Sequence, residues 1–249
     1  MPMFTTSLSQ QLQAAGAGSQ FYPLTSSLQK GIILGDTFDR ETLTPTGAYT
    51  LYTVTSNDGS GTAAIISATR LELVTDLSAA GDDVSVRTSG IYMPRITVSD
   101  AINQKSMFTL DIVFKLNEIT NTEGFIGLHV GGGALSALPT TAAHMGLFWD
   151  ASAQANFRFT SAENTTQSNN DTTQALSTSV YRLRIIWNGK TSNTIELYSG
   201  TSPAINTLVS SITSTTTPNS ENMQLHFFVQ TEALEAKTLI IHEWKGSVQ

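Results

Sequence analysis

The sequence predicts an all-β protein in which two antiparallel sheets pack face to face as a sandwich. Many short segments alternate apolar and polar residues with a period of two, as half-buried strands do. Polar turns separate these segments at short spacing, and no long stretch has a helical period. The crossover helices that a parallel sheet requires are therefore missing, which favours antiparallel sheets.

The most regular segment is 108–116, FTLDIVFKL. One face of the predicted strand carries only large apolar residues: Phe108, Leu110, Ile112, Phe114 and Leu116. The other face carries Thr109, Asp111 and Lys115. We expect the apolar face to form the core of the sandwich.

The segment 180–200 predicts a β-hairpin. In its first half, Tyr181, Leu183, Ile185 and Trp187 alternate with mostly polar residues, and in its second half Ile195 and Leu197 alternate with Glu196 and Tyr198. Between them, Asn188 and Gly189 are a pair that tolerates positive φ. Because an isolated hairpin is marginal in water, other strands must cover its apolar face.

Further strands are predicted in chain order around these two elements. Residues 32–34 open the domain, and Pro94 places its strand at an edge or a bulge. The other predicted strands are 49–54, 64–67, 70–74, 84–88, 91–98, 124–130, 145–150, 156–160, 208–212, 225–230 and 238–245.

Residues 1–34 form a predicted N-terminal arm, and residues 35–249 form the sandwich domain. The arm has few apolar side chains, and Gly16, Gly18 and Pro23 interrupt its one weak helical stretch. Two interpretations stay open: a segment that becomes ordered on a neighbouring subunit, or a frayed terminus.

Composition excludes several classes of function. Charged residues make up 13% of the chain, and the formal net charge is -7. Since phosphate binding needs clustered Lys and Arg, nucleic acid is not an expected partner. With no cysteine, neither disulfides nor thiolate metal sites are expected. The sequence shows no secretion signal and no membrane-spanning run, so we expect a soluble chain that is not exported by the usual signal.

Four segments carry a resemblance to a known family: SMFTLDIVFKLNEITNTEGFIGL at 106–128, GLFWDASAQANFRF at 146–159, VYRLRIIWNG at 180–189, and QLHFFVQTEALEAKTLIIHEWKG at 224–246. Together they resemble the concanavalin A-like or laminin-G-like jelly roll, in the versions found in bacteriophage and other viral structural proteins. The resemblance spans roughly residues 35–244 and implies a jelly-roll order of strands.

Catalysis is not expected. Glycosidases of this fold carry an E-x-D-x-x-E strand, in which alternation directs paired carboxylates into the groove, and that strand is absent. Glu232 and Glu235 lie three residues apart in a predicted exposed loop, Asp82 and Asp83 are adjacent and so face apart, and Asp111 has no second acid in its strand. The sequence has neither a G-x-S-x-G elbow nor a phosphate loop. We therefore predict no catalytic residue.

Metal and glycan sites are weaker hypotheses, and we predict no cofactor or metal site. Four histidines are candidate metal ligands: His129, His144, His226 and His242. His226 and His242 fall in predicted strands and could lie side by side near Glu243. Loop oxygen donors of the kind that calcium prefers are Asp36, Asp39, Asn57, Asp58, Asp82 and Asp83, although such residues more often make turns. Aromatic residues that could stack on sugar are Tyr52, Trp149, Tyr198 and Trp244. Two N-x-T sequons lie at Asn164 and Asn170.

The sequence therefore favours a virion structural protein, a capsid decoration, cement or spike protein that binds the major capsid protein or other virion proteins. We expect a homo-oligomer, a trimer by preference, located in the virion and assembled in the host cytoplasm, with a surface glycan as a further partner. The alternative is a carbohydrate-binding, lectin-like module of a phage tail or adhesin. A glycosidase of the same fold is the third and disfavoured hypothesis.

Overall fold

A computed structural model describes residues 33–36, 52–57, 61–66, 69–88, 108–130, 134–140, 142–163, 166–187, 193–201, 204–214 and 223–248. Within these ranges the chain forms fifteen strands and no helix. The strands are β1 (Ile33–Asp36), β2 (Tyr52–Thr55), β3 (Thr62–Ile66), β4 (Arg70–Val74), β5 (Asp83–Thr88), β6 (Phe108–Leu116), β7 (Thr122–Val130), β8 (His144–Asp150), β9 (Asn156–Glu163), β10 (Thr166–Ala175), β11 (Val180–Trp187), β12 (Asn193–Thr201), β13 (Ala204–Ser214), β14 (Met223–Thr231) and β15 (Thr238–Val248).

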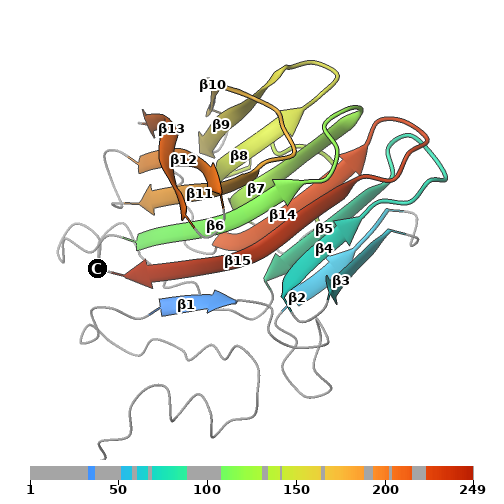
Figure 1. Ribbon diagram of the computed structural model, residues 1–249, viewed down its shortest axis with the longest axis horizontal. Coiled ribbons are helices and arrows are strands. Elements are labelled where there is room, and N and C mark those ends of the chain that lie inside the picture. The colour runs from blue at the N-terminus through green and yellow to red at the C-terminus, as the bar shows by residue number, and fades with distance from the viewer. Residues whose placement is uncertain are drawn as a thin grey trace, which may run out of the picture.

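The strands form two antiparallel sheets, as predicted (Figure 1). Sheet A has the order β13-β12-β11-β6-β15-β4-β3, with β1 paired to β15 beside this path. Sheet B has the order β10-β9-β8-β7-β14-β5-β2. The connections from β4 to β5, β6 to β7 and β14 to β15 each pass from one sheet to the other. Strands far apart in sequence, such as β6 and β15, therefore lie side by side, which is the jelly-roll arrangement.

Strand β6 is central in sheet A, and its predicted inward face is confirmed. Leu110, Ile112 and Phe114 have no exposed surface, and Phe108 and Leu116 are 1% exposed. The predicted hairpin is also present, because β11 pairs with β12 in register from Tyr181 opposite Ser199 to Ile186 opposite Thr194. Its apolar face is buried, as a hairpin requires: Leu183, Ile185 and Leu197 have no exposed surface, and β11 pairs with β6 on its other edge.

Most of the aromatic residues considered for sugar stacking belong to the core. Tyr52, Trp149 and Trp244 are at most 1% exposed. The Trp244 indole Nε1 donates a hydrogen bond to the Tyr52 hydroxyl at 2.9 Å, so the polar tips of the two rings satisfy each other inside the sandwich. Tyr198 alone of the four lies at the surface, half-buried on sheet A, with the Arg182 guanidinium 4.2 Å above its ring.

Strand β1 shows where the body of the protein begins within the described residues. Ile33 pairs with Ser247, Leu34 with Gly246 and Asp36 with Trp244. Strand β4 pairs with the first half of β15, while β6 takes the other edge of β15. β1 and β4 therefore share one edge of β15 end to end, and the sheet starts two residues before the predicted boundary at residue 35. Residues 1–32 lie outside the described ranges.

A second, smaller hydrophobic cluster lies on the outer face of sheet B, defined as the face directed away from the main core. It consists of Phe125, Phe148 and Phe228, with Leu135 packed on them and Leu138 partly buried beside them. The Leu135 backbone N–H donates to the Ser85 hydroxyl at 3.2 Å. The segment that contains Leu135 thus covers the middle of this face and leaves its two ends as separate regions.

Several predicted features lie outside the described residues: the segment 91–98 with Pro94, the donors Asp39 and Asp58, and the sequon at Asn164. In the part of the chain that the structure describes, no helix is long and apolar enough to cross a membrane.

Candidate functional site

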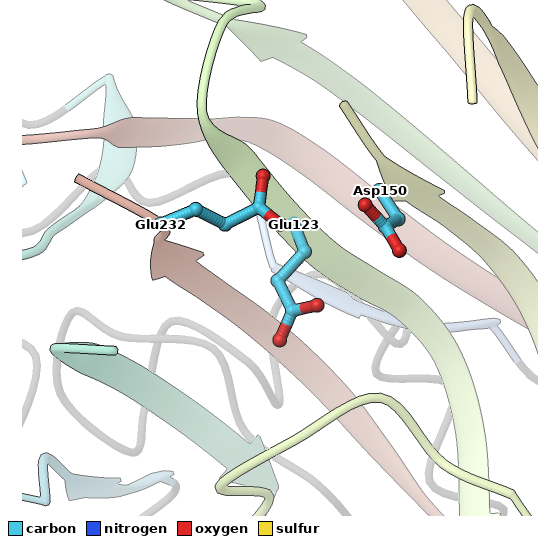
Figure 2. Close-up of side chains that lie close together, drawn as sticks. All are labelled: Glu123, Asp150 and Glu232. Atoms are coloured by element: carbon cyan, nitrogen blue, oxygen red, sulfur yellow. The ribbon is translucent and has the colours of Figure 1, made fainter. Parts of the chain in front are cut away.

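Three carboxylates converge at one end of sheet B. They belong to Glu123 near the start of β7, Asp150 at the end of β8 and Glu232 directly after β14 (Figure 2). One carboxylate oxygen from each lies within 4.8 Å of the other two. All three side chains are half-buried. We call this group the acidic cluster.

Strand register brings the three acids together. Glu123 stands directly opposite Asp150 across the β7–β8 pair and opposite Gln230 across the β7–β14 pair. Opposed residues in an antiparallel pair have Cβ atoms about 5 Å apart. Glu232 follows β14 and is held by its backbone N–H, which donates to the Asn121 carbonyl at 2.8 Å. Asn121 has a φ of 49°, a conformation that Asn tolerates better than most residues.

The residue after Glu123 explains how the strand is fixed over the core. A Cβ atom on Gly124 would overlap the ring of Trp149 and approach the Phe228 carbonyl oxygen to 2.5 Å. Trp149 is fully buried, and its indole N–H donates to the Thr122 hydroxyl at 3.4 Å. Because Gly124 and the Trp149 ring occupy the inner side, alternation turns Glu123 to the outer face.

The Ser152 hydroxyl links two of the acids. Its Oγ lies 2.8 Å from Asp150 Oδ1 and 2.6 Å from Glu232 Oε1. A hydroxyl has one proton, so it can donate to only one of the two carboxylates at a time. Glu232 Oε2 is buried and has no hydrogen-bond partner among the described residues. The cluster therefore holds more acceptor oxygens than the described residues supply with donors.

The electrostatics of the cluster favour protonation of one member. Burial, followed by the negative charges of Asp150 and Glu232, raises the pKa of Glu123 from 4.5 to about 7. Three carboxylates so close together repel one another when ionised. Near neutral pH the cluster consequently keeps a proton on Glu123 or attracts a cation in its place.

Two kinds of chemistry fit this arrangement. Carboxylate and hydroxyl oxygens are the ligands that a hard cation such as Ca²⁺ prefers, and the same oxygens accept hydrogen bonds from sugar hydroxyls. A protonated Glu beside ionised acids also resembles the acid and base pair of a glycosidase. The chain has no E-x-D-x-x-E strand, but Glu123 and Asp150 pair across two strands, so two carboxylates can come together here without that motif.

Sequence reasoning missed Glu123 and Asp150 and misplaced Glu232. Glu232 was predicted to be exposed, but it is half-buried in the cluster. Glu235 is exposed, yet its carboxylate lies 2.6 Å from the Nζ of Lys237, whose side chain is 1% exposed. The two acids therefore belong to different environments. The signal in the sequence was an acid at the second position of β7 and another at the last position of β8, which antiparallel pairing places opposite each other.

The described oxygen donors that the sequence suggested for calcium lie in a turn or in strands and do not converge on one site. The Asp82 carboxylate accepts from the Ser78 hydroxyl at 2.9 Å and from the Ala79 N–H at 2.8 Å. Asp83 opens strand β5 and does not lie in a loop as predicted, and its Oδ1 accepts from the Asn57 N–H at 3.2 Å. Asp36 ends β1. Asp111 accepts a bidentate contact from Arg184 at 2.8 and 3.2 Å on sheet A.

The histidines are grouped differently from the prediction. His242 lies on β15 of sheet A and His226 on β14 of sheet B, so the expected pair of these two does not form. His226 instead faces His129, with ring centroids 5.1 Å apart, and His129 stacks near His144 at 6.4 Å. His144 Nδ1 donates to the Ala142 carbonyl at 2.7 Å, and its Nε2 accepts from the Thr160 hydroxyl at 2.8 Å. The sequon residue Asn170 lies in β10 and donates to Ser168.

Comparison with known proteins places the fold. No family model matches the chain, and no curated protein sequence matches it. A protein of unknown function from Shewanella oneidensis MR-1 is similar in structure, with a TM-score of 0.61 at 16% identity, over 100% of this chain and 96% of that one.

Two plant lectins are similar in the same way. Lectin I from Ulex europaeus, solved with the methyl glycoside of α-L-fucose, has a TM-score of 0.57 at 11% identity and covers 89% of this chain and 99% of its own. Lectin UEA-II, solved with galactose, has a TM-score of 0.57 at 13% identity and covers 89% of this chain and 100% of its own. The chain therefore has the concanavalin A-like jelly-roll fold of the legume lectins.

Proposed function

We propose that this protein is a lectin-like carbohydrate-binding module. The observation that carries the proposal is the acidic cluster, in which Glu123, Asp150 and Glu232 present convergent oxygen atoms at one end of a sheet in a lectin-like sandwich. The two lectins that share the fold were solved with sugars bound, which supports the assignment without identifying a ligand for this chain.

The cluster acts in this proposal as the polar anchor of the glycan. Its ionised carboxylates accept hydrogen bonds from vicinal sugar hydroxyls, and charged acceptors make such bonds roughly twice as strong as neutral ones. A bound Ca²⁺ would be held by Glu123, Asp150 and Glu232, because hard oxygen donors match this cation. The exposed Ser152 hydroxyl, which touches two of the acids, adjusts its single proton to whichever acceptor the ligand leaves free.

Calcium-dependent stability tests the cation part of the proposal. Ca²⁺ should raise the melting temperature of the protein in a concentration-dependent way, because a ligand that binds only the folded state stabilises it by mass action. Glu123→Gln should abolish the increase, since it removes one charged donor from the cluster. Glu235→Gln is the matched control. Glu235 is an exposed acid three residues after Glu232, but it pairs with Lys237 and does not belong to the acidic cluster. An equal calcium response in all three proteins would contradict a cation site here.

We further propose that the protein binds sugar without hydrolysing it. The cluster has three acids and one bridging hydroxyl at a strand end, which is sufficient for anchoring a glycan. Incubation with β-glucans and other oligosaccharides, followed by analysis of reducing ends, should give no product. Hydrolysis that disappears in Glu123→Gln would overturn this proposal and would make Glu123, with its pKa raised to about 7, the general acid.

The virion role predicted from the sequence stays a competing proposal. It includes the major capsid protein as partner, a trimeric assembly and location in the virion, and neither the fold nor the three similar structures above favour it over glycan binding. Its test is co-purification of the chain with capsids. A chain that binds capsids but recognises no glycan would replace the lectin proposal with this one.

A further inference from the structure

Several buried polar side-chain atoms on the outer face of sheet B, in strands β5, β7 and β14, have no hydrogen-bond partner among the described residues. His226 has no exposed surface, yet neither of its ring nitrogens has a hydrogen-bond partner among the described residues. The same holds for Nη1 of Arg87, Nδ1 of His129 and Oε1 of Gln224, which are all buried atoms. A buried polar atom that is left unpaired destabilises the folded state, because it has given up its hydrogen bonds to water. Such a concentration in one place therefore points to a ligand.

The four side chains are neighbours in the sheet. His226 stands directly opposite Arg87 across the β14–β5 pair, and Gln224 stands directly opposite His129 across the β14–β7 pair. The rings of His129 and His226 are 5.1 Å apart at an angle of 65°. Arg87, His129 and Gln224 are half-buried, so part of each side chain reaches the surface beside His226, which has no exposed surface.

The charge of this region favours an anion over a metal cation. Arg87 is permanently positive. The described cross-strand partners in the two rows that contain these residues include no carboxylate. One row runs from Thr53 through Arg87, His226, Gly127, Gly146 and Thr160 to Asn169, and the other runs from Gln224 through His129, His144 and Ala162 to Gln167. Glu123 of the acidic cluster lies six residues from His129 along β7, about 20 Å away at the usual rise of a strand.

Both histidines of this group are uncharged near neutral pH. Burial is the largest cause that lowers the pKa of His226 from 6.5 to about 3, and the charges of His129 and Arg87 add to it. Burial also lowers the pKa of His129. Each neutral ring therefore offers one N–H donor, and Arg87 supplies the positive charge of the group.

We propose that Arg87, His129, Gln224 and His226 form a binding site for an oxyanion, a carboxylate or sulfate group carried by an acidic sugar or free in solution. We call it the oxyanion site. The Arg87 guanidinium supplies a charge-assisted hydrogen bond, and the buried His226 ring donates through its one N–H. The Gln224 side-chain amide can rotate to present its NH₂ group in place of its oxygen. The site is separate from the acidic cluster and does not depend on the proposed function of that cluster.

One side of the oxyanion site is apolar. A Cβ atom on Gly127 would lie 3.0 Å from the Phe125 ring, and a Cβ on Gly146 would lie equally close to it, so this ring covers the two glycines. The Phe125 ring also packs edge-on against His144, with centroids 5.9 Å apart. An anionic group with an apolar body on that side, as in a sugar acid, would contact both the donors and the ring.

The experiment is a titration of the full chain with sodium sulfate and with glucuronate, followed by NMR of the histidine rings, with glucose as the neutral probe. Sulfate or glucuronate should shift the ring signals of His129 and His226 and raise the pKa of His226, because a bound anion stabilises the imidazolium. Glucose should do neither. Tighter binding of glucuronate would identify an acidic sugar, and equal binding would identify a free anion, both within the proposal.

Two variants and one control separate the site from general charge effects. Arg87→Gln and His226→Phe should each weaken binding at least about tenfold, the loss expected from one charge-assisted hydrogen bond. Arg158→Gln, a half-buried arginine of the same sheet on β9, should leave binding unchanged. His226→Phe should fold, because it removes the unpaired nitrogens and keeps an aromatic ring in their place.

Three results would overturn the oxyanion site: no shift of the His129 and His226 signals with either anion, an equal loss in Arg158→Gln and Arg87→Gln, or binding that survives in His226→Phe. Glu123→Gln distinguishes this site from the proposed lectin function. It should abolish glycan binding at the acidic cluster while leaving the affinity for sulfate as it is in the wild type.

Discussion

Replacing Glu123 with Gln should stabilise the protein above neutral pH and leave its stability unchanged in acid. The folded state raises the pKa of this carboxyl from 4.5 to about 7, mainly through burial and then through Asp150 and Glu232. Between pH 4.5 and about 7 the folded chain therefore holds a proton that the unfolded chain has released. Its stability falls as pH rises through this window, and the penalty is complete above pH 7.

The size of the effect follows from the pKa. Each tenfold change in proton affinity corresponds to about 1.4 kcal/mol, so the full rise to about 7 corresponds to about 3 kcal/mol. Glu123 is only half-buried, and solvent screening reduces the cost of its charge. We therefore expect Glu123→Gln to increase the free energy of unfolding by about 1–2 kcal/mol above pH 7.

The assay is urea-induced unfolding of the wild type and the variant at about pH 4.5 and about pH 8, in the absence of calcium. Subtracting the two proteins at each pH removes the contributions of other titrating groups that do not contact the cluster. Glu235→Gln should behave in the opposite way, because a hydrogen bond from Lys237 lowers the pKa of Glu235. That carboxylate contributes stability above pH 4.5 and loses it as the pH falls.

The reasoning would be refuted by a Glu123→Gln variant that is no more stable than the wild type above neutral pH. The same conclusion would follow if the variant were stabilised equally at both pH values. Either result would mean that burial and the charges of Asp150 and Glu232 do not raise the pKa of Glu123 in the folded state.

Three further predictions concern the body of the protein. Leu110→Ala should lower the free energy of unfolding by about 2–5 kcal/mol, whereas Lys115→Ala, on the other face of β6, should change it by less than about 0.5 kcal/mol; similar losses would show that the inward face is misassigned. The buried, neutral His226 contributes stability that is complete above pH 6.5 and is lost as the pH falls towards about 3. In urea unfolding at a series of pH values, His226→Phe should therefore lose less stability than the wild type between pH 6.5 and about 3. An equal loss in both proteins would contradict this. The trimer expected from the sequence should disappear in mass photometry when residues 1–32 are removed, while the melting temperature stays close to that of the full chain. Removal of residues 1–36 should also lower the melting temperature, because it removes β1 from the edge of β15. A trimer that persists without residues 1–32 would show that they are dispensable for assembly.

The fold could be predicted because period-two alternation records burial directly. In β6 and β11 every second residue is buried, so their inward faces could be assigned from sequence alone. The order of strands within each sheet could not be worked out from the pattern itself, because neighbours such as β6 and β15 are far apart in sequence. The family resemblance implied a jelly roll, but it did not specify which strands pair.

The candidate site was harder to predict because its residues come together only through register. Glu123 and Asp150 are opposite each other solely because β7 and β8 pair in one alignment, and a shift by one residue would turn one of the two acids to the other face. The histidines failed for the same reason: membership of a strand does not reveal the sheet, and His226 and His242 lie in different sheets. Local alternation shows which face of a strand a residue occupies, but it does not show which residue of another strand lies opposite.

Glycan-array binding is the most direct measurement of the central claim. The wild-type protein, in buffer with Ca²⁺, should bind a restricted set of glycans. Glu123→Gln, which is expected to be at least as stable as the calcium-free wild type, should bind none of them, and Glu235→Gln should bind the same set. Binding by Glu123→Gln equal to that of the wild type, or no glycan bound by the wild type, would contradict the assignment of the acidic cluster as a carbohydrate-binding site.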